Sequence, residues 1–130
     1  MDTSKQYIEM CDCPEIQEPK RSAGLVHGDY ISPTQRPDQW DIVYDPSKAL
    51  RYGLLECVWL PRQDQLQEMV GYKGLPYLLT QTFERSVNGE SCNYTWNNGE
   101  HFTSMEQLWL AFVMKEKYDK VWNGKWVDRV

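Results

Sequence analysis

The residues that could do chemistry in this chain are few and scattered. Asp64 and Glu68 stand four residues apart among strong helix formers, a spacing that could present two carboxylates to a metal ion. His101 could serve as a base for Cys57 or Cys92 acting as a nucleophile. No third group accompanies such a pair, and a solvated acidic helix face is the favoured explanation of the two carboxylates. The sequence therefore predicts no catalytic residue.

The four cysteines form no ligand pattern. Cys11 and Cys13 are separated by one residue, which is shorter than the spacing of common zinc sites. Cys57 lies in an apolar run and Cys92 in a strand pattern, so both are expected to be buried thiols. The chain also lacks the glycine-rich loops that bind phosphate. We expect no metal and no cofactor, and an enzyme of unknown type ranks third among the possible functions.

A protein-interaction patch is the first function expected of these side chains. Arginine and tryptophan are common anchors of protein interfaces, and here they stand three residues apart at the start of a polar helix. The predicted patch comprises Trp59, Arg62, Gln63, Asp64 and Gln67. The alternative that remains open for each of them is an ordinary amphipathic helix lying on a sheet.

A second hypothesis is a small aromatic platform that binds nucleic acid or sugar. Trp96 would supply the ring, and the asparagines at 93, 97 and 98 would supply polar partners. Strand pairing across the Asn-Gly pair at 88–89 places Trp96 on the apolar face of its hairpin, which favours a place in the core.

The elements that must position these residues are organised around one helix. Residues 104–120 contain neither Gly nor Pro, and the seven residues Leu108–Met114 are all apolar. Such a run predicts a helix that is enclosed on most sides. A capping box can begin it in two registers, from Thr103 or from Ser104. The cations that suit its C-terminal end are Lys115, Lys117 and Lys120.

Three Asn-Gly pairs indicate chain reversals, because both residues of such a turn must tolerate positive φ. The pair at 88–89 predicts a hairpin over 78–96. The pair at 98–99 leads to a short return strand at 100–102. The pair at 123–124 allows either a tight hairpin or a helix stop followed by an extended tail.

Shorter elements are expected in the first half of the chain. A helix begins near Ser4 and is interrupted by Pro14, which either ends it or opens a second helix at its first position. Residues 19–39 are rich in turn formers and predict a loop around one strand at 29–32. The further elements expected are strands at 40–44 and 54–60, the second buried on both faces, a single helical turn at 47–53, and a helix at 62–70 that stops at Gly71 or Gly74.

These elements predict an α+β fold in a single domain over residues 1–130. An antiparallel sheet of hairpin or meander type would pack against the long helix of the C-terminal half, with shorter helices near the N-terminus and at 62–70. A chain of 130 residues can bury such a core without disulfides or metals.

Charge and hydropathy restrict the classes of binding partner that we expect. The formal net charge is −5, and the first 60 residues carry six Lys/Arg against ten Asp/Glu, which disfavours nucleic acid as a ligand. No apolar run approaches the roughly 18–20 residues that cross a bilayer. The first residues show neither a basic nor an apolar signal region, so we expect a soluble, cytoplasmic protein.

Three stretches of the chain resemble small uncharacterised bacteriophage and prophage proteins. They are residues 7–11 (YIEMC), 59–67 (WLPRQDQLQ) and 114–127 (MKEKYDKVWNGKWV), in the same order over most of the chain. The resemblance implies a phage or prophage origin, a bacterial cytoplasm and an α+β domain, but no activity and no site residue. We therefore expect an accessory protein that binds an unidentified host or phage protein.

Overall fold

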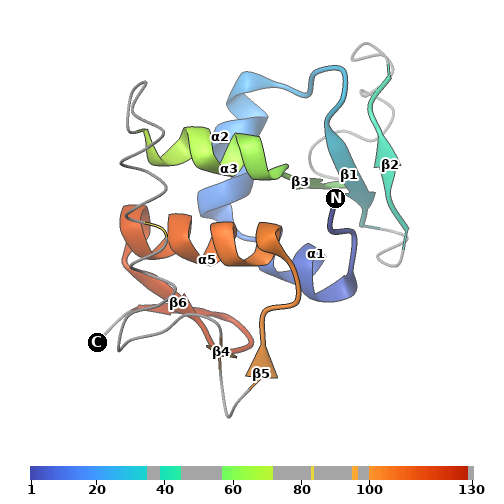
Figure 1. Cartoon of the computed structure of the whole chain (residues 1–130). Coiled ribbons are helices and arrows are strands. Elements are labelled where there is room, and N and C mark those ends of the chain that lie inside the picture. The colour runs from blue at the N-terminus through green and yellow to red at the C-terminus, as the bar shows by residue number, and fades with distance from the viewer. Residues whose placement is uncertain (35–38, 45–56, 72–82, 84–94, 97–99, 129–130) are drawn as a thin grey trace. The chain divides into compact units, whose positions relative to one another are not determined.

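The computed structural model describes residues 1–34, 39–44, 57–71, 83, 95–96 and 100–128 (Figure 1). The chain divides into two compact units, Met1–Arg62 and Gln63–Val130, called here the N-terminal and C-terminal units. Helices are combined with antiparallel strand pairs, so the predicted α+β class is confirmed. A single domain over 1–130 stays a prediction.

The N-terminal unit begins with two helices in succession. Helix α1 (Lys5–Cys11) starts after Ser4, whose hydroxyl accepts a hydrogen bond from the Tyr7 amide at 3.2 Å. Helix α2 (Pro14–Ala23) starts at Pro14, where the missing N–H is not needed. Of the two roles predicted for this proline, the second is therefore confirmed.

The loop predicted from residue 19 is wrong in its first part, because α2 continues through Pro19 to Ala23. A proline inside a helix removes one backbone hydrogen bond and crowds the preceding turn. The helix persists here because its buried residues, Ile16 and Gln17, fix it to the rest of the unit.

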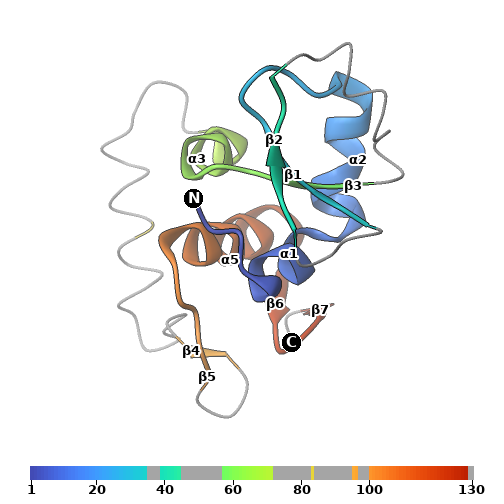
Figure 2. The same ribbon diagram turned by 90° about the vertical axis from the view of Figure 1, so that its right-hand side faces the viewer.

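A three-stranded antiparallel sheet follows, in the order β2-β1-β3 (Figure 2). Its strands are β1 (Tyr30–Pro33), β2 (Asp41–Ile42) and β3 (Cys57–Leu60). Tyr30 lies opposite Ile42 on one side and Leu60 on the other. Strands thus form in the regions predicted at 29–32, 40–44 and 54–60, but the second is shorter than predicted. The helical turn predicted at 47–53 lies outside the described residues.

Strand β3 carries the core of this unit. All four of its residues are buried, as predicted, and both α1 and α2 pack against it. The buried Tyr7 hydroxyl donates a hydrogen bond to the Pro61 carbonyl at 2.6 Å, which joins α1 to the end of β3. Ile31, Val43 and Cys57 form a further apolar cluster, with Leu25 packed against it.

In the C-terminal unit, helix α3 (Gln63–Val70) lies alongside helix α5 (Met105–Tyr118) in both views (Figures 1 and 2). Leu66 is the fully buried residue of α3. Gly71 follows with φ +65°, so this glycine supplies the predicted stop. Gly74 lies outside the described residues.

Helix α5 is the predicted core helix. The Ser104 hydroxyl accepts from the Gln107 amide at 3.1 Å, and the Gln107 side chain accepts from the Thr103 amide at 3.0 Å, so the capping register that begins at Ser104 is the one formed. Its buried apolar residues run from Trp109 to Met114, while Leu108 is half-buried.

The C-terminal end of α5 differs from the prediction. Asp119 adopts the left-handed conformation, with φ 55°, and ends the helix after Tyr118. Lys115 and Lys117 therefore lie in the last turn as expected, but Lys120 begins a strand.

Two strand pairs complete the unit. Strand β4 (Thr95–Trp96) pairs with β5 (Glu100–His101), which confirms the predicted reversal between them. Most of the hairpin predicted over 78–96 lies outside the described residues, but Phe83, which belongs to the first predicted strand, is helical, so the prediction is wrong at that residue. Strand β6 (Lys120–Trp122) pairs with β7 (Trp126–Asp128), so a hairpin and not an extended tail forms at 123–124. The Trp122 and Trp126 rings pack with centroids 5.0 Å apart.

Candidate interaction surface

The five residues of the predicted patch occupy different environments. Trp59 is only 4% exposed, and Arg62 is half-buried. On α3, Asp64 is exposed, while Gln63 and Gln67 are half-buried. Trp59 and Arg62 belong to the N-terminal unit and the other three to the C-terminal unit, so neither unit alone contains the patch. Whether these residues bind a partner stays a prediction, but the Trp59 ring does not lie at the surface.

Trp59 is held in place by the buried side chain of Gln17. The Gln17 amide oxygen accepts from the Trp59 backbone N–H, and its NH₂ group donates to the Trp59 carbonyl, both at 2.9 Å. The same NH₂ group donates to the Cys11 carbonyl at 2.8 Å. Gln17 thus gives β3 the donor and acceptor that a neighbouring strand would supply.

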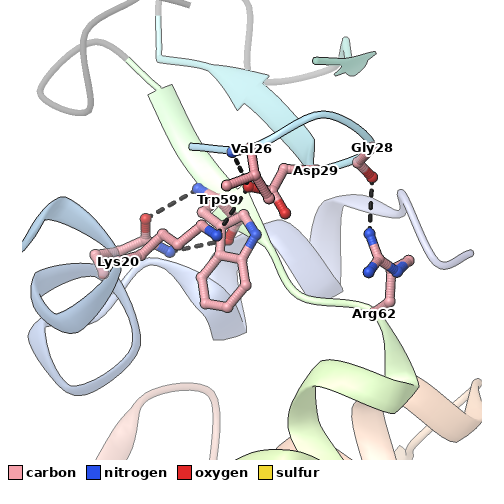
Figure 3. Close-up of polar contacts among 7 residues, drawn as sticks. Lys20, Val26, Gly28, Asp29, Trp59 and Arg62 are labelled. Carbon is pink, nitrogen blue, oxygen red and sulfur yellow. Dashed lines mark hydrogen bonds and ion pairs between the residues drawn. The ribbon is translucent and has the colours of Figure 1, made fainter. Parts of the chain in front are cut away.

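A buried ion pair joins α2 to the turn before β1. Lys20 Nζ lies 2.8 Å from Asp29 Oδ2, with the two side chains 11% and 0% exposed, and it also lies 4.7 Å from the centre of the Trp59 ring (Figure 3). Asp29 Oδ2 further accepts from the Val26 amide at 2.8 Å. The buried carboxylate is therefore both paired and hydrogen-bonded, as a buried charge requires.

The turn at residues 26–29 extends the pairing of β1 with β2. The Val43 amide donates to the Asp29 carbonyl at 2.8 Å, and the Gly28 amide donates to the Val43 carbonyl at 2.7 Å. Arg62 Nη1 donates to the Gly28 carbonyl at 2.8 Å, as Figure 3 shows. Gly28 has φ +92°, a conformation that side-chain-bearing residues rarely adopt. Backbone pairing thus fixes the chain as far as Val43.

One face of this sheet carries exposed aromatic side chains. Because successive residues of an extended strand face opposite sides, Trp40, Ile42 and Tyr44 share a face, and Tyr30 lies opposite Ile42. Trp40 is 48% exposed and Tyr44 72%. Together with the exposed Val26 and His27 of the preceding turn, they form what we call the aromatic surface: Val26, His27, Tyr30, Trp40 and Tyr44.

The rings of the aromatic surface are in contact in pairs. Tyr30 and Trp40 have centroids 5.8 Å apart with planes tilted by 33°. His27 and Tyr44 meet edge to face at 6.3 Å. Such pairs prefer offset or edge-to-face arrangements, so these rings support one another at the surface.

The aromatic surface was not predicted from the sequence, although residues 40–44 carry a signal for it. In residues 40–44, the large apolar side chains of Trp40, Ile42 and Tyr44 alternate with Asp41 and Val43. That alternation defines the two faces of a strand but not which face is covered. In the folded chain Val43 is buried, while Trp40 and Tyr44 face solvent.

The described cysteines are unreactive by environment. Cys11, Cys13 and Cys57 are free thiols and all are buried, which confirms the expectation for Cys57, while Cys92 lies outside the described residues. Burial raises the pKa of the Cys13 thiol from 9.0 to about 12, and burial also raises the pKa of Cys11 well above 9.0. Both therefore stay protonated at neutral pH, and a protonated thiol is a poor nucleophile.

The part of the chain that the structure describes shows neither a metal-binding cluster nor a membrane-spanning helix. Those residues contain no group of three or more His, Cys, Asp or Glu side chains placed to hold a metal ion. No helix within the same residues is both long and apolar enough to span a membrane.

No known protein family matches this chain, and neither a curated protein nor a solved structure shows significant similarity to it. The resemblance to phage and prophage proteins stays a prediction.

Proposed function

We propose that this chain is a non-enzymatic protein-interaction module, an accessory protein of phage or prophage origin that binds a host or phage protein in the bacterial cytoplasm. Its binding surface is the aromatic surface of the N-terminal unit. The observation that supports this function is the exposure of Trp40 and Tyr44, at 48% and 72%, on one face of a sheet. Clustered exposed aromatic side chains are typical of protein-binding surfaces.

The backbone beneath this surface is fixed before any partner arrives. Asp29 ties the turn at 26–29 to Lys20 of α2 and to Val43 beyond β2. A partner would therefore not have to order the strand that presents Trp40. Pre-organisation of this kind lowers the entropic cost of association and leaves more of the contact energy as affinity.

The other functions considered have less support. Nucleic acid would meet a chain with a net charge of −5. The aromatic platform expected around Trp96 falls on a residue whose side chain lies outside the described structure. No described cluster of side chains supplies an activated nucleophile, because the thiols of Cys11 and Cys13 are buried and protonated.

Affinity capture from a bacterial lysate tests the proposal. A partner retained by the wild-type chain is purified, and its affinity is measured for Trp40→Ala and Tyr44→Ala. We expect at least about a tenfold loss for each, because exposed aromatic anchors dominate interface energies.

Met105→Ala is the matched control, since Met105 is 45% exposed but lies on α5, away from the aromatic surface in sequence. Its affinity should equal that of the wild type. Arg62→Ala and Asp64→Ala test the patch predicted from the sequence. If Trp40→Ala and Tyr44→Ala both bind the partner with the affinity of the wild type, the proposal is refuted.

A further inference from the structure

We propose that the aromatic surface binds a proline-rich segment in the polyproline II conformation that also carries basic residues. This inference rests on the proposed function, because it names the partner class of the same surface. Aromatic side chains are the usual receptors for such segments, which bind in a preformed extended conformation and so lose little entropy.

The arrangement of the rings fits an extended ligand. Trp40 and Tyr44 are four residues apart on one face of the extended segment, and Tyr30 lies between them in register, opposite Ile42. Two residues of a strand advance by roughly 6.7 Å, so the outer rings span roughly 13 Å. A polyproline II segment rises about 3.1 Å per residue, and four to five residues would cover that length.

The rings also remain available to a ligand. In the buried core of the C-terminal unit, Phe83 and Trp109 stack in parallel, with centroids 4.0 Å apart and planes at 5°. The Tyr30 and Trp40 rings are further apart, at 5.8 Å, and tilted by 33°. Their faces are therefore not fully covered by each other, and a proline ring can pack on the exposed part.

Two side chains of the aromatic surface can also donate hydrogen bonds to the carbonyl oxygens of such a ligand. Within the described part of the chain, neither the Trp40 indole N–H nor the Tyr44 hydroxyl is hydrogen-bonded. A polyproline II segment has no internal hydrogen bonds, so its carbonyl oxygens can accept from both groups.

Addition of a ligand strand to the edge of β2 is less favourable. The Val43 amide donates to the Asp29 carbonyl. The backbone groups of Ile42, one position earlier in β2, therefore point away from β1. The Ile42 amide donates to the Asp41 carboxylate at 2.8 Å and is thus already occupied. A charged side chain at this position is a common protection of an edge strand. The ligand must be recognised through the rings.

The negative charge of the chain favours a ligand with basic residues beside its prolines. Residues 1–62 carry ten Asp/Glu and seven Lys/Arg, and the whole chain has a net charge of −5. Asp41, next to Trp40 in the chain, is also exposed. Arginine or lysine on the ligand would therefore be attracted, whereas acidic peptides, nucleic acid and anionic lipids would be repelled.

The test is a titration of the full chain followed by ¹H–¹⁵N NMR. The probe is a decaproline peptide with two arginines at each end, and its control has the same arginines around ten alternating glycines and serines. Trp40→Phe identifies the Trp40 indole signal, because that variant lacks it. We expect saturable shifts of this signal and of the amides at 26–30 and 41–44 with the proline peptide alone.

Trp40→Ala and Tyr44→Ala should each weaken binding of the proline peptide at least about tenfold, with amide spectra otherwise unchanged. The inference would be overturned if the proline peptide caused no saturable shifts, or if the glycine-serine peptide bound equally well. It would also be overturned if the proline peptide failed and a sugar, cellohexaose, shifted the same signals. If Trp40→Ala still weakens binding of a captured protein partner in any of these cases, the proposed function stands and only the inference about proline-rich segments fails. If the partner is also independent of Trp40, both fail.

Discussion

Two buried polar residues, Gln17 and Asp29, connect the elements of the N-terminal unit at the scale of single side chains. Gln17 bonds α2 to backbone groups of Cys11 and Trp59. Asp29 bonds Lys20 and the Val26 amide through its carboxylate. A buried polar group is costly unless it is satisfied, so each of these side chains stabilises the native arrangement and penalises others.

Replacement of Gln17 should be strongly destabilising. Gln17→Met keeps the approximate volume but leaves the buried Trp59 N–H and two carbonyls without their partners. We expect a loss of about 2–5 kcal/mol in the free energy of unfolding, measured by urea titration. The neighbouring Glu18 is exposed on the same helix, so Glu18→Met should change stability by less than about 0.5 kcal/mol. Equal effects of the two substitutions would contradict the role given to Gln17.

The Lys20–Asp29 pair should behave as a coupled unit. Lys20→Met leaves a fully buried carboxylate without its cation, and we expect a cost of about 3–5 kcal/mol. Adding Asp29→Asn removes the unpaired charge, so the double variant should be more stable than Lys20→Met alone. Arg21→Met, at an exposed neighbouring position, is the control. A double variant less stable than Lys20→Met would show that the charge is not the source of the cost.

The Cys13 thiol should make stability depend on alkaline pH. Burial raises its pKa from 9.0 to about 12 in the folded chain, so the unfolded chain loses this proton first as pH rises. Below pH 9 neither state is ionised there, and the thiol adds no pH dependence. Between pH 9 and about 12 the free energy of unfolding should fall as pH rises.

Urea titrations from pH 7 to pH 10.5 measure this effect, and Cys13→Ala isolates it from the other groups that titrate in the range. The decline of stability should be shallower in Cys13→Ala than in the wild type. Parallel pH profiles for the two chains would mean that the thiol is accessible to water.

At the scale of elements, helix α5 shows how local and tertiary effects combine. Its beginning is set locally by Ser104 and Gln107, and its end by the left-handed Asp119. Its middle is set by packing, since the Trp109 ring stacks on Phe83 and meets Phe112 edge to face at 5.7 Å. The helix is therefore both well capped and enclosed, which suits the core of the C-terminal unit.

Two leucines on α5 provide a matched comparison. Leu110 is fully buried, and Leu110→Ala should cost about 2–5 kcal/mol, as should Phe112→Ala, because each leaves a cavity. Leu108 is half-buried, so Leu108→Ala should cost distinctly less. Denaturant unfolding of the three variants measures the order. A loss for Leu108→Ala equal to that for Leu110→Ala would mean that the burial of the helix is misassigned.

At the scale of the whole molecule, charge restricts the partners. The chain carries 19 Asp/Glu against 14 Lys/Arg. The cations near the end of α5, Lys115 and Lys117, are accompanied by Glu116 and Asp119. Non-specific attraction to nucleic acid needs clustered cations that release counterions, and this chain has too few.

Binding to random duplex DNA should therefore be negligible. At about 0.15 M salt we expect an affinity weaker than the ~10⁻⁴–10⁻⁶ M of typical non-specific binders, measured by fluorescence anisotropy of a labelled duplex. Micromolar binding that falls steeply with added salt would favour the nucleic-acid hypothesis over a protein partner.

The sequence by itself determined the features that depend on near neighbours. The cap at Ser104, the start of α2 at Pro14, the stop at Gly71 and the reversal between 96 and 100 follow from short-range turn and capping rules. The α+β class followed as well, because periodicity separates helices from strands.

Only the tertiary structure decided the features that depend on distant residues. Pro19 lies inside a helix that is fixed by Gln17, which bonds Trp59 across 42 positions of sequence. The exposure of Trp40 was likewise undecided by the sequence, because the pattern at 40–44 separates the two faces of a strand without showing which one is covered. Which face of a strand is covered depends on the helices that pack against it, and here α1 and α2 pack on β3.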